Sequence, residues 1–217
     1  MTTPSHTQIF DRYTSLGRDC EVGFQIKRVL GFQESGFFNW NYTDPEPLLS
    51  LLSSDFSGIL EAENLSVHTG GALIRDASHD FFMHHEFDIN LFKDAPDFSK
   101  RLVDLKAKFD YFINEFKKSA ASPNHTAYFL KYEAANARGF ALKVQAELTR
   151  YHKGNPFAII LLQTSDRAES DWCLSGIHNR YLKRFAPYDD TLDAHVPTWD
   201  NVFREFPHKS PLRFANY

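Results

Sequence analysis

The chain of 217 residues contains only two cysteines, Cys20 and Cys173. Two cysteines in a chain of this length exclude a fold built on several disulfides. Ten glycines and ten prolines without a repeating period exclude collagen-like and low-complexity chains. The longest apolar run, residues 157–162, is far shorter than the roughly 18–20 residues of a membrane-spanning helix, so we expect no membrane partner.

An excess of charge of one sign is also lacking. The chain has 24 Lys and Arg against 28 Asp and Glu, a net charge of −4. A globally basic surface is therefore absent from the composition, and we expect no nucleic-acid partner. Residues 1–8 are polar and lack the apolar segment of a signal peptide. We expect a flexible N-terminus over residues 1–8 and a cytoplasmic protein.

Aromatic side chains are abundant, with 21 Phe, 9 Tyr and 3 Trp. They supply far more buriable surface than an intrinsically disordered chain carries. A chain of this length also has room for a substantial core. The composition therefore indicates a globular fold.

The first elements expected are a short strand, a tight turn and a helix. Residues 9–16 alternate roughly between apolar and polar side chains and end at Gly17. After Asp19, one helical face is marked by the apolar residues Val22, Ile26, Val29 and Leu30. We expect Asp19 to cap this helix and Gly31 to end it, which puts Cys20 in the first turn.

The middle of the chain carries weaker signals. Phe37–Trp40 is an aromatic cluster that fits a brief strand or an ordered loop, and Pro45 opens an expected leucine-rich helix. Two strands are expected, around residues 72–75 and across residues 79–89. The Gly70-Gly71 pair would allow a hairpin in this region.

The second half alternates long helices with apolar strands. Its expected elements are a helix over 97–118, a strand over 127–132, a helix over 136–151, strands over 157–163 and 178–185, and a helix over 198–206. Strands separated by long helices need crossover connections, which favour a parallel sheet covered on both faces. We therefore predict a single three-layer α/β domain with a largely parallel sheet over residues 9–217.

Cys20 is the first candidate catalytic residue. A thiol in the first turn of a helix lies near unpaired backbone N–H groups, which favour the thiolate and can stabilise an oxyanion. Cys20 also follows a strand, and ligand sites in open α/β sheets lie beyond the carboxyl ends of strands. A small buried apolar residue is the alternative. Cys173 has no helix start and no cysteine at metal-ligand spacing, so we expect it to be incidental.

Three histidines, His79, His84 and His85, form the second candidate group. If residues 79–89 are one strand, His79 and His85 share a face and lie about 20 Å apart at ~3.3 Å per residue. That separation is too large for one metal ion. One imidazole can instead act as the general base for Cys20. A partly exposed strand with satisfied histidines is the alternative.

Four carboxylates lie in loops after expected strands: Asp166, Asp171, Asp189 and Asp190. Such groups can form a glycosidase pair or a metal site, and with Trp and Tyr they suit a carbohydrate-directed transferase. Their spacing is not specific, and solvated loop charges are the simpler interpretation. The segment 15–20 lacks the glycine spacing of a phosphate loop. We expect no cofactor and no metal.

The order of several short motifs resembles one bacterial family. Ser15-Leu16-Gly17 is followed by Cys20 and a helix, then by Phe38-Asn39-Trp40, then by an aromatic strand with His85-Glu86-Phe87. This order is similar to that of the bacterial domain family described as papain-like cysteine peptidases. The pattern of that family runs Ser-Leu-Gly-x-x-Cys, then Phe-Asp-Trp, then His-Asp-Phe or His-Glu-Phe. The resemblance covers about residues 13–206.

This resemblance implies a nucleophile at Cys20 and a general base at His85. His79 competes for the second role, because His79-Asp80-Phe81 also fits the later motif. The family has aspartate where this chain has Asn39. An asparagine can still orient the imidazole as a hydrogen-bond acceptor, as in a Cys-His-Asn triad. The resemblance also implies a papain-like α+β fold, with the cysteine on a helical half and the histidine on an antiparallel half.

The function expected is a thiol-dependent enzyme acting on an acyl bond. A peptidase- or amidase-like hydrolase and an acyltransferase both proceed through a thioester. A carbohydrate-directed transferase and a non-catalytic binding domain remain alternatives. The substrate class is open between a small molecule, a peptide and a glycan, and so is the oligomeric state. An ion pair between Cys20 and His85 would lower the pKa of the cysteine and raise that of the histidine.

Overall fold

The computed structural model describes residues 8–32, 36–68, 73–84, 86, 92–187 and 189–214. Its larger sheet has four parallel strands in the order β1-β6-β7-β8. The strands are β1 (Arg12–Ser15), β6 (Thr126–Lys131), β7 (Phe157–Thr164) and β8 (Ile177–Leu182). The central strands β6 and β7 are buried along almost their whole length, which explains their continuous apolar sequences.

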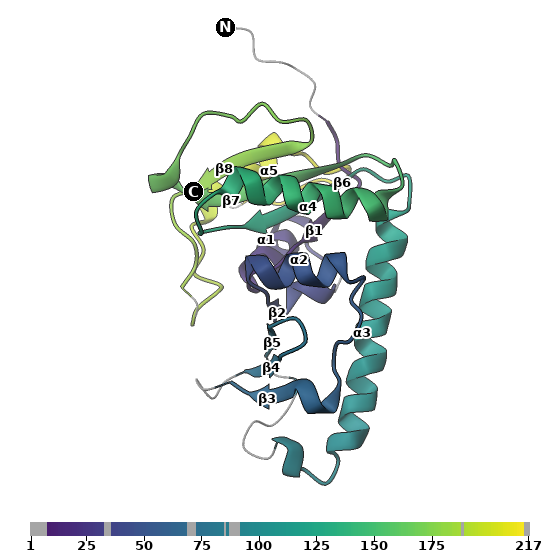
Figure 1. The fold of residues 1–217 in the computed structure, drawn as a ribbon. Helices are drawn as coiled ribbons and strands as arrows, with labels where there is room; N and C mark the ends of the chain where they lie inside the picture. The colour runs from purple at the N-terminus through teal and green to yellow at the C-terminus, as the bar shows by residue number, and fades with distance from the viewer. Residues whose placement is uncertain are drawn as a thin grey trace, which may run out of the picture.

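Helices cover both faces of this sheet (Figure 1). Helices α1 (Glu21–Leu30) and α5 (Val196–Glu205) share one hydrophobic cluster with one face of the sheet. Helices α2 (Pro45–Ser53) and α4 (Ala137–His152) belong to the cluster on the other face. The three-layer α/β fold with a largely parallel sheet is therefore confirmed.

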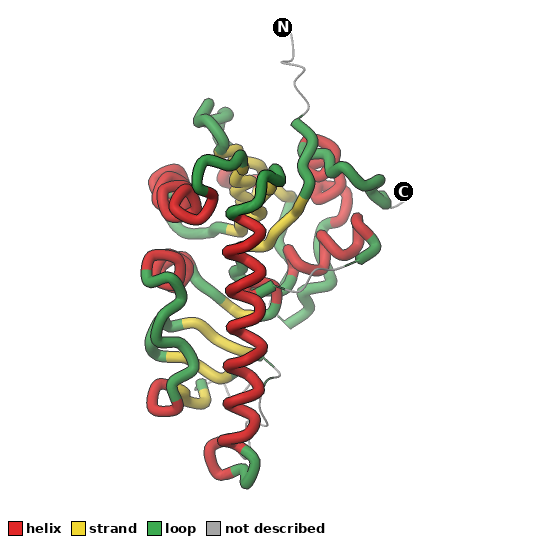
Figure 2. Tube along the Cα trace, turned by 90° about the vertical axis from the view of Figure 1, so that its right-hand side faces the viewer, coloured by secondary structure: helices red, strands yellow, loops and turns green. Residues whose placement is uncertain are grey.

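A second sheet, which the sequence indicated only as a hairpin, is antiparallel and has the order β2-β5-β4-β3. Its short strands are β2 (Asn41–Tyr42), β3 (Leu65–Val67), β4 (Ile74–Asp76) and β5 (Phe81–Met83). The long helix α3 (Phe98–Ala120) runs past both sheets (Figure 2). Buried side chains of this sheet, such as Phe81, share one core cluster with Phe109 of α3 and with Leu161 of the parallel sheet.

Several local expectations need correction. Phe37–Asn39 forms a single turn of 3-10 helix, η1, and no strand. The strand expected across residues 79–89 is limited to Phe81–Met83 in the described part of the chain, and His79 lies in the turn before it. The hairpin joins β3 to β4, on either side of the glycine pair at 70–71, which lies outside the described residues. Further 3-10 turns are η2 (Ala62–Asn64), η3 (Phe92–Asp94) and η4 (Ser165–Arg167).

No helix in the described residues combines the length and the apolar character needed to cross a membrane. In the longest helix, α3, the buried residues are apolar, and Lys, Asp and Glu lie between them in the sequence. Its amphipathic pattern matches its position between the two sheets and solvent.

Candidate functional site

Cys20 lies just beyond the carboxyl end of β1, at the edge of the parallel sheet where ligand sites of such folds lie. The chain turns at Gly17, whose φ of 86° is in the left-handed region, and Arg18 follows with φ 44°. Cys20 is the N-cap of α1, and its carbonyl accepts the first helical hydrogen bond from Phe24 N at 3.0 Å. The expected strand-turn-helix unit is thus confirmed, with Cys20 at the cap.

Asp19, expected as the cap residue, still supplies the capping interaction. Its Oδ1 accepts a hydrogen bond from the backbone N–H of Glu21 at 3.0 Å. This hydrogen bond satisfies one of the free N–H groups at the helix start. The N–H of Glu21 is therefore not available to an oxyanion while it is hydrogen-bonded to Asp19. Of the N–H groups around Cys20 that were expected to stabilise the oxyanion, this one is already occupied.

A buried lysine joins the two carboxylates that flank Cys20. Lys131, the last residue of β6, is only 2% exposed. Its Nζ lies 2.7 Å from Asp19 Oδ2 and 2.5 Å from Glu21 Oε2. Charged groups this deeply buried are stable only when they are paired and hydrogen-bonded. This ionic cluster (Asp19, Glu21, Lys131) fixes the chain on both sides of the cysteine.

The ionic cluster also contacts the segment after β8 and the helix α5. Glu21 accepts hydrogen bonds from Trp199 Nε1 at 2.8 Å and from Ala186 N at 3.0 Å. The ammonium of Lys131 also lies 4.6 Å from the ring centroid of Phe185. The helix start that carries Cys20 is therefore contacted by the last residue of β6, by the segment after β8 and by the helix α5.

The same turn is tied to the antiparallel sheet through Arg18. Its carbonyl accepts a hydrogen bond from Thr43 N at 2.9 Å, directly after β2. Its guanidinium is hydrogen-bonded to Glu133 and lies 4.0 Å from Asp44. The turn before Cys20 therefore lies where the two sheets meet.

Burial raises the pKa of the Cys20 thiol to about 11, and the negative charge of Asp19 adds to this effect, while Lys131 opposes it. The charged form is disfavoured because Cys20 is only partly accessible to water. The expectation that the helix start by itself favours the thiolate is therefore wrong, because burial and the charge of Asp19 raise the pKa of Cys20 in the described residues. A thiolate at neutral pH needs a further cationic or basic partner.

Asn39 is buried and lies against α1. It belongs to η1 and is 8% exposed. A Cβ atom added to Gly23 would lie 3.5 Å from the Asn39 carbonyl oxygen and 3.6 Å from its Cβ. These are ordinary van der Waals distances, so Asn39 lies directly against the first turn of α1, three residues after Cys20. The amide that the resemblance assigns to the imidazole is thus near the helix of the candidate nucleophile.

The two candidate bases differ in what the structure says of them. His79 has both ring nitrogens engaged, with Ser50 Oγ 2.7 Å from Nδ1 and Ser57 O 2.7 Å from Nε2. These partners belong to α2 and the turn after it, and Cys20 is not among them. His85 lies outside the described residues. The strand that precedes it, β5, ends at Met83, whose Cα partner is Asn41, two residues after Asn39.

Cys173, Asp171 and Asp190 each have a hydrogen-bond or ion-pair partner. Cys173 is exposed, and its N–H donates to Asp171 Oδ1 at 2.8 Å. Asp171 also pairs with Arg180 at 3.0 Å, and Asp190 Oδ1 accepts from Leu192 N at 3.3 Å. In the described part of the chain, no group of three His, Cys, Asp or Glu residues is arranged to hold a metal ion.

The residues that sequence reasoning missed are Lys131 and Glu21. The available signal was a lysine at the end of the apolar run 127–130, inside an expected buried strand. A charge at such a position has to meet a partner of opposite charge. That partner is contributed by residues 110 positions away, which no local pattern identifies.

No curated protein and no solved structure shows significant similarity to this chain. A protein-family model does match, over residues 11–166, which include Cys20, Asn39 and Lys131. The match spans well over half of the chain and supports a thiol enzyme in general terms. The chain belongs to the family described as Putative papain-like cysteine peptidase (DUF1796).

Proposed function

We propose that the protein is a cysteine hydrolase that cleaves an acyl bond of the peptide or amide class, with Cys20 as the nucleophile and His85 as the general base. The position of Cys20 carries the proposal. It caps a helix at the carboxyl edge of a parallel sheet, and the buried ionic cluster holds it from both sides. Membership of a family of cysteine peptidases supports the same chemistry.

The reaction begins when the Cys20 sulfur attacks the carbonyl carbon and its proton passes to the imidazole. The imidazolium then protonates the leaving amine, and a thioester remains on Cys20. Water, activated by the same imidazole, hydrolyses the thioester and restores the thiol. A base is required because the described surroundings raise the pKa of Cys20 to about 11. Asn39, against the same helix, orients the imidazole as a hydrogen-bond acceptor.

Lys131 takes no part in proton transfer in this scheme. Its ammonium is held by two carboxylates and is shielded from water. Its role is to fix Asp19 and Glu21, and with them the helix start that presents the thiol. Lys131 is therefore a positioning residue.

The experiment that tests the proposal follows acyl transfer to each thiol. The protein is incubated with p-nitrophenyl acetate, and the acetylated residue is located by mass spectrometry. We expect acetylation of Cys20, release of p-nitrophenol that Cys20→Ala abolishes, and near-normal release in Cys173→Ala. Release that persists in Cys20→Ala would reject the nucleophile.

Hydrolysis and acyl transfer are separated by adding an acceptor amine such as glycinamide. A hydrolase forms mainly acetate under these conditions. An acyltransferase forms mainly the acetylated amine, because the amine intercepts the thioester. We expect acetate as the main product.

A further inference from the structure

In the described residues, β1 is an edge strand of the parallel sheet. It pairs with β6 on one side, and it is the outermost strand of the sheet. The N–H groups of Asp11 and Arg12 both donate to His125 O, at 2.8 and 3.3 Å, which forms a bulge. Leu16 N donates to Phe129 O at 3.0 Å. Since main-chain direction alternates along a strand, Tyr13 and Ser15 direct their N–H and C=O groups away from β6.

The two residues that carry these outward groups are largely buried. Tyr13 is 6% exposed and Ser15 is 2% exposed. In the described part of the chain, no hydrogen bond accounts for the outward N–H and C=O groups of these two residues. The outward groups face the cavity described below, where water or a bound main chain can hydrogen-bond to them.

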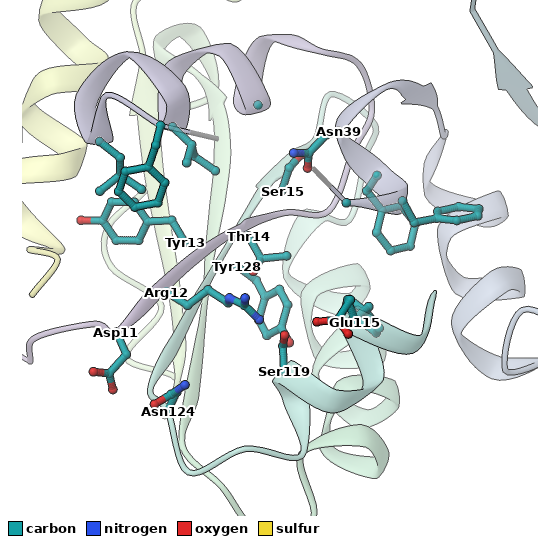
Figure 3. A pocket seen from close by; sticks show the side chains of 18 of the residues that line it. Asp11, Arg12, Tyr13, Thr14, Ser15, Asn39, Glu115, Ser119, Asn124 and Tyr128 are labelled. Carbon is teal, nitrogen blue, oxygen red and sulfur yellow. The ribbon is translucent and has the colours of Figure 1, made fainter. Parts of the chain in front are cut away.

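A cavity of about 550 Å³ opens along this edge (Figure 3). Its volume falls in the range of sites that enclose ligands. Ile26 and Leu30 of α1 line one wall, and Phe112 and Phe116 of α3 line the other. These apolar side chains alternate with polar and charged ones in the rest of the lining, among them Arg12, Glu115 and Lys209.

The edge of β1 already accepts one segment of this chain. Phe10 N donates to Pro207 O at 2.9 Å, and Lys209 N donates to Phe10 O at 2.8 Å. This contact is a parallel bridge between Phe10 and His208. The segment then leaves the edge, because Arg213 N donates to Val29 O on α1 at 2.7 Å. Among the described residues, no segment pairs with the edge of β1 at Tyr13 and Ser15.

We propose that this cavity binds an extended peptide from another molecule, which adds to β1 as a strand. The N–H and C=O groups of Tyr13 and Ser15 supply its main-chain hydrogen bonds, and Ile26 and Leu30 of α1 with Phe112 and Phe116 of α3 contact its apolar side chains. Strands pair about 4.8 Å apart. A strand added to β1 would therefore lie between the side chains of α1 and α3 that line the cavity.

The proposal does not depend on the chemistry of Cys20. It adds a binding site next to the candidate active site, because Ser15, Gly23 and Asn39 line the cavity and Gly23 follows Cys20 by three residues. Ser15 and Asn39 lie at one end of the cavity, and Asp11 and Asn124 lie at the other (Figure 3).

The test selects a phage-displayed library of random linear peptides against the full chain. The strongest binder is labelled with fluorescein and titrated by fluorescence anisotropy. Ser119→Trp places an indole in the cavity from α3 and should weaken binding by about tenfold or more. Asn114→Trp, at an exposed position on the same helix that does not line the cavity, should leave binding unchanged.

Amide hydrogen exchange gives the second readout. The peptide should slow the exchange of the Tyr13 and Ser15 amides, while Thr14, already bonded to β6, should not change. Selection of no binder, or a binder that ignores Ser119→Trp, would overturn the proposal. So would protection of the same amides by self-association without peptide. Cys20→Ala should keep full peptide binding, which separates this proposal from the enzymatic one.

Discussion

Lys131 shows how much the site depends on one buried charge. Its ammonium pairs with Asp19 and Glu21 while almost no water reaches it. Lys131→Met leaves these carboxylates without that partner, so we expect the free energy of unfolding to fall by about 3–5 kcal/mol. Urea denaturation measures the change. Lys143→Met, at an exposed position on α4, should stay within about 0.5 kcal/mol of the wild type. A loss below about 1 kcal/mol for Lys131→Met would contradict the ionic cluster.

His152 gives a pH dependence with a definite sign. Its ring is buried, its Nε2 lies 2.8 Å from Tyr128 Oη, and burial lowers its pKa from 6.5 to about 4. Between these values the unfolded chain binds the proton and the folded chain does not. The contribution of the neutral His152 ring to the free energy of unfolding is therefore fully present above pH 6.5. It falls by about 3 kcal/mol as the pH is lowered to 4.

The measurement is urea unfolding at several pH values from 7 to 4. His152→Gln cannot titrate, so its stability should fall less steeply over this range than that of the wild type. Other histidines contribute to the pH dependence of stability in both proteins, since burial also lowers the pKa of His178. Parallel pH profiles for the two proteins would contradict a buried neutral His152.

At the scale of elements, the end of α1 depends on Gly31. This residue has φ 75°, and its N–H donates to Lys27 O at 2.8 Å. A β-carbon there is strained by the backbone conformation, so Gly31→Ala should cost about 1 kcal/mol. The new Cβ would also lie 2.5 Å from Arg213 Nη1, at the flexible end of that side chain.

Thermal or urea unfolding of Gly31→Ala in an Arg213→Ala background separates the two causes. The cost should remain in that background, since the strain lies in the backbone of Gly31. A cost that disappears when the guanidinium is removed would show that the contact, and not the backbone conformation, limits this position.

The elements that could be predicted from the sequence are the long ones, in which the hydrophobic pattern continues over many residues. The helix expected over 97–118 and the strand expected over 157–163 match α3 and β7 to within a few residues. The antiparallel sheet was largely missed because its strands have only two or three residues, too few to show alternation. The order of its strands is set by pairing between segments distant in the sequence and by the packing of their buried side chains against α3.

The candidate site was predictable to a similar extent. Cys20 was identified because strand, glycine turn and helix are local features, and Asn39 because of a short motif. Lys131 and Glu21 were missed because their role comes from a contact across 110 residues. The raised pKa of Cys20 was also beyond the sequence, since it follows from burial and from the position of Asp19.

At the scale of the whole molecule, the candidate cysteine belongs to the part of the fold built on the parallel sheet. Cys20 is on α1, next to the parallel sheet, and the His-Glu-Phe motif follows β5 of the antiparallel sheet. The turn at Arg18 joins the two at Thr43. The resemblance to papain-like peptidases implies a cysteine on a helical part and a histidine on an antiparallel part, and His85 itself lies outside the described residues. The parallel sheet under α1 was the expectation drawn from the helix and strand order.

The most direct test of the central claim is the rate at which iodoacetamide alkylates Cys20, measured against pH in a Cys173→Ala background. If His85 pairs with Cys20, alkylation should continue well below the ~8.5 of a free thiol. In His85→Ala the profile should move up toward pH 11, where the described surroundings hold the pKa of the thiol. His79→Ala is the matched control and should leave the profile unchanged, because its ring is bound by Ser50 and Ser57. A profile that His85→Ala does not alter, or that only His79→Ala shifts, would contradict the account.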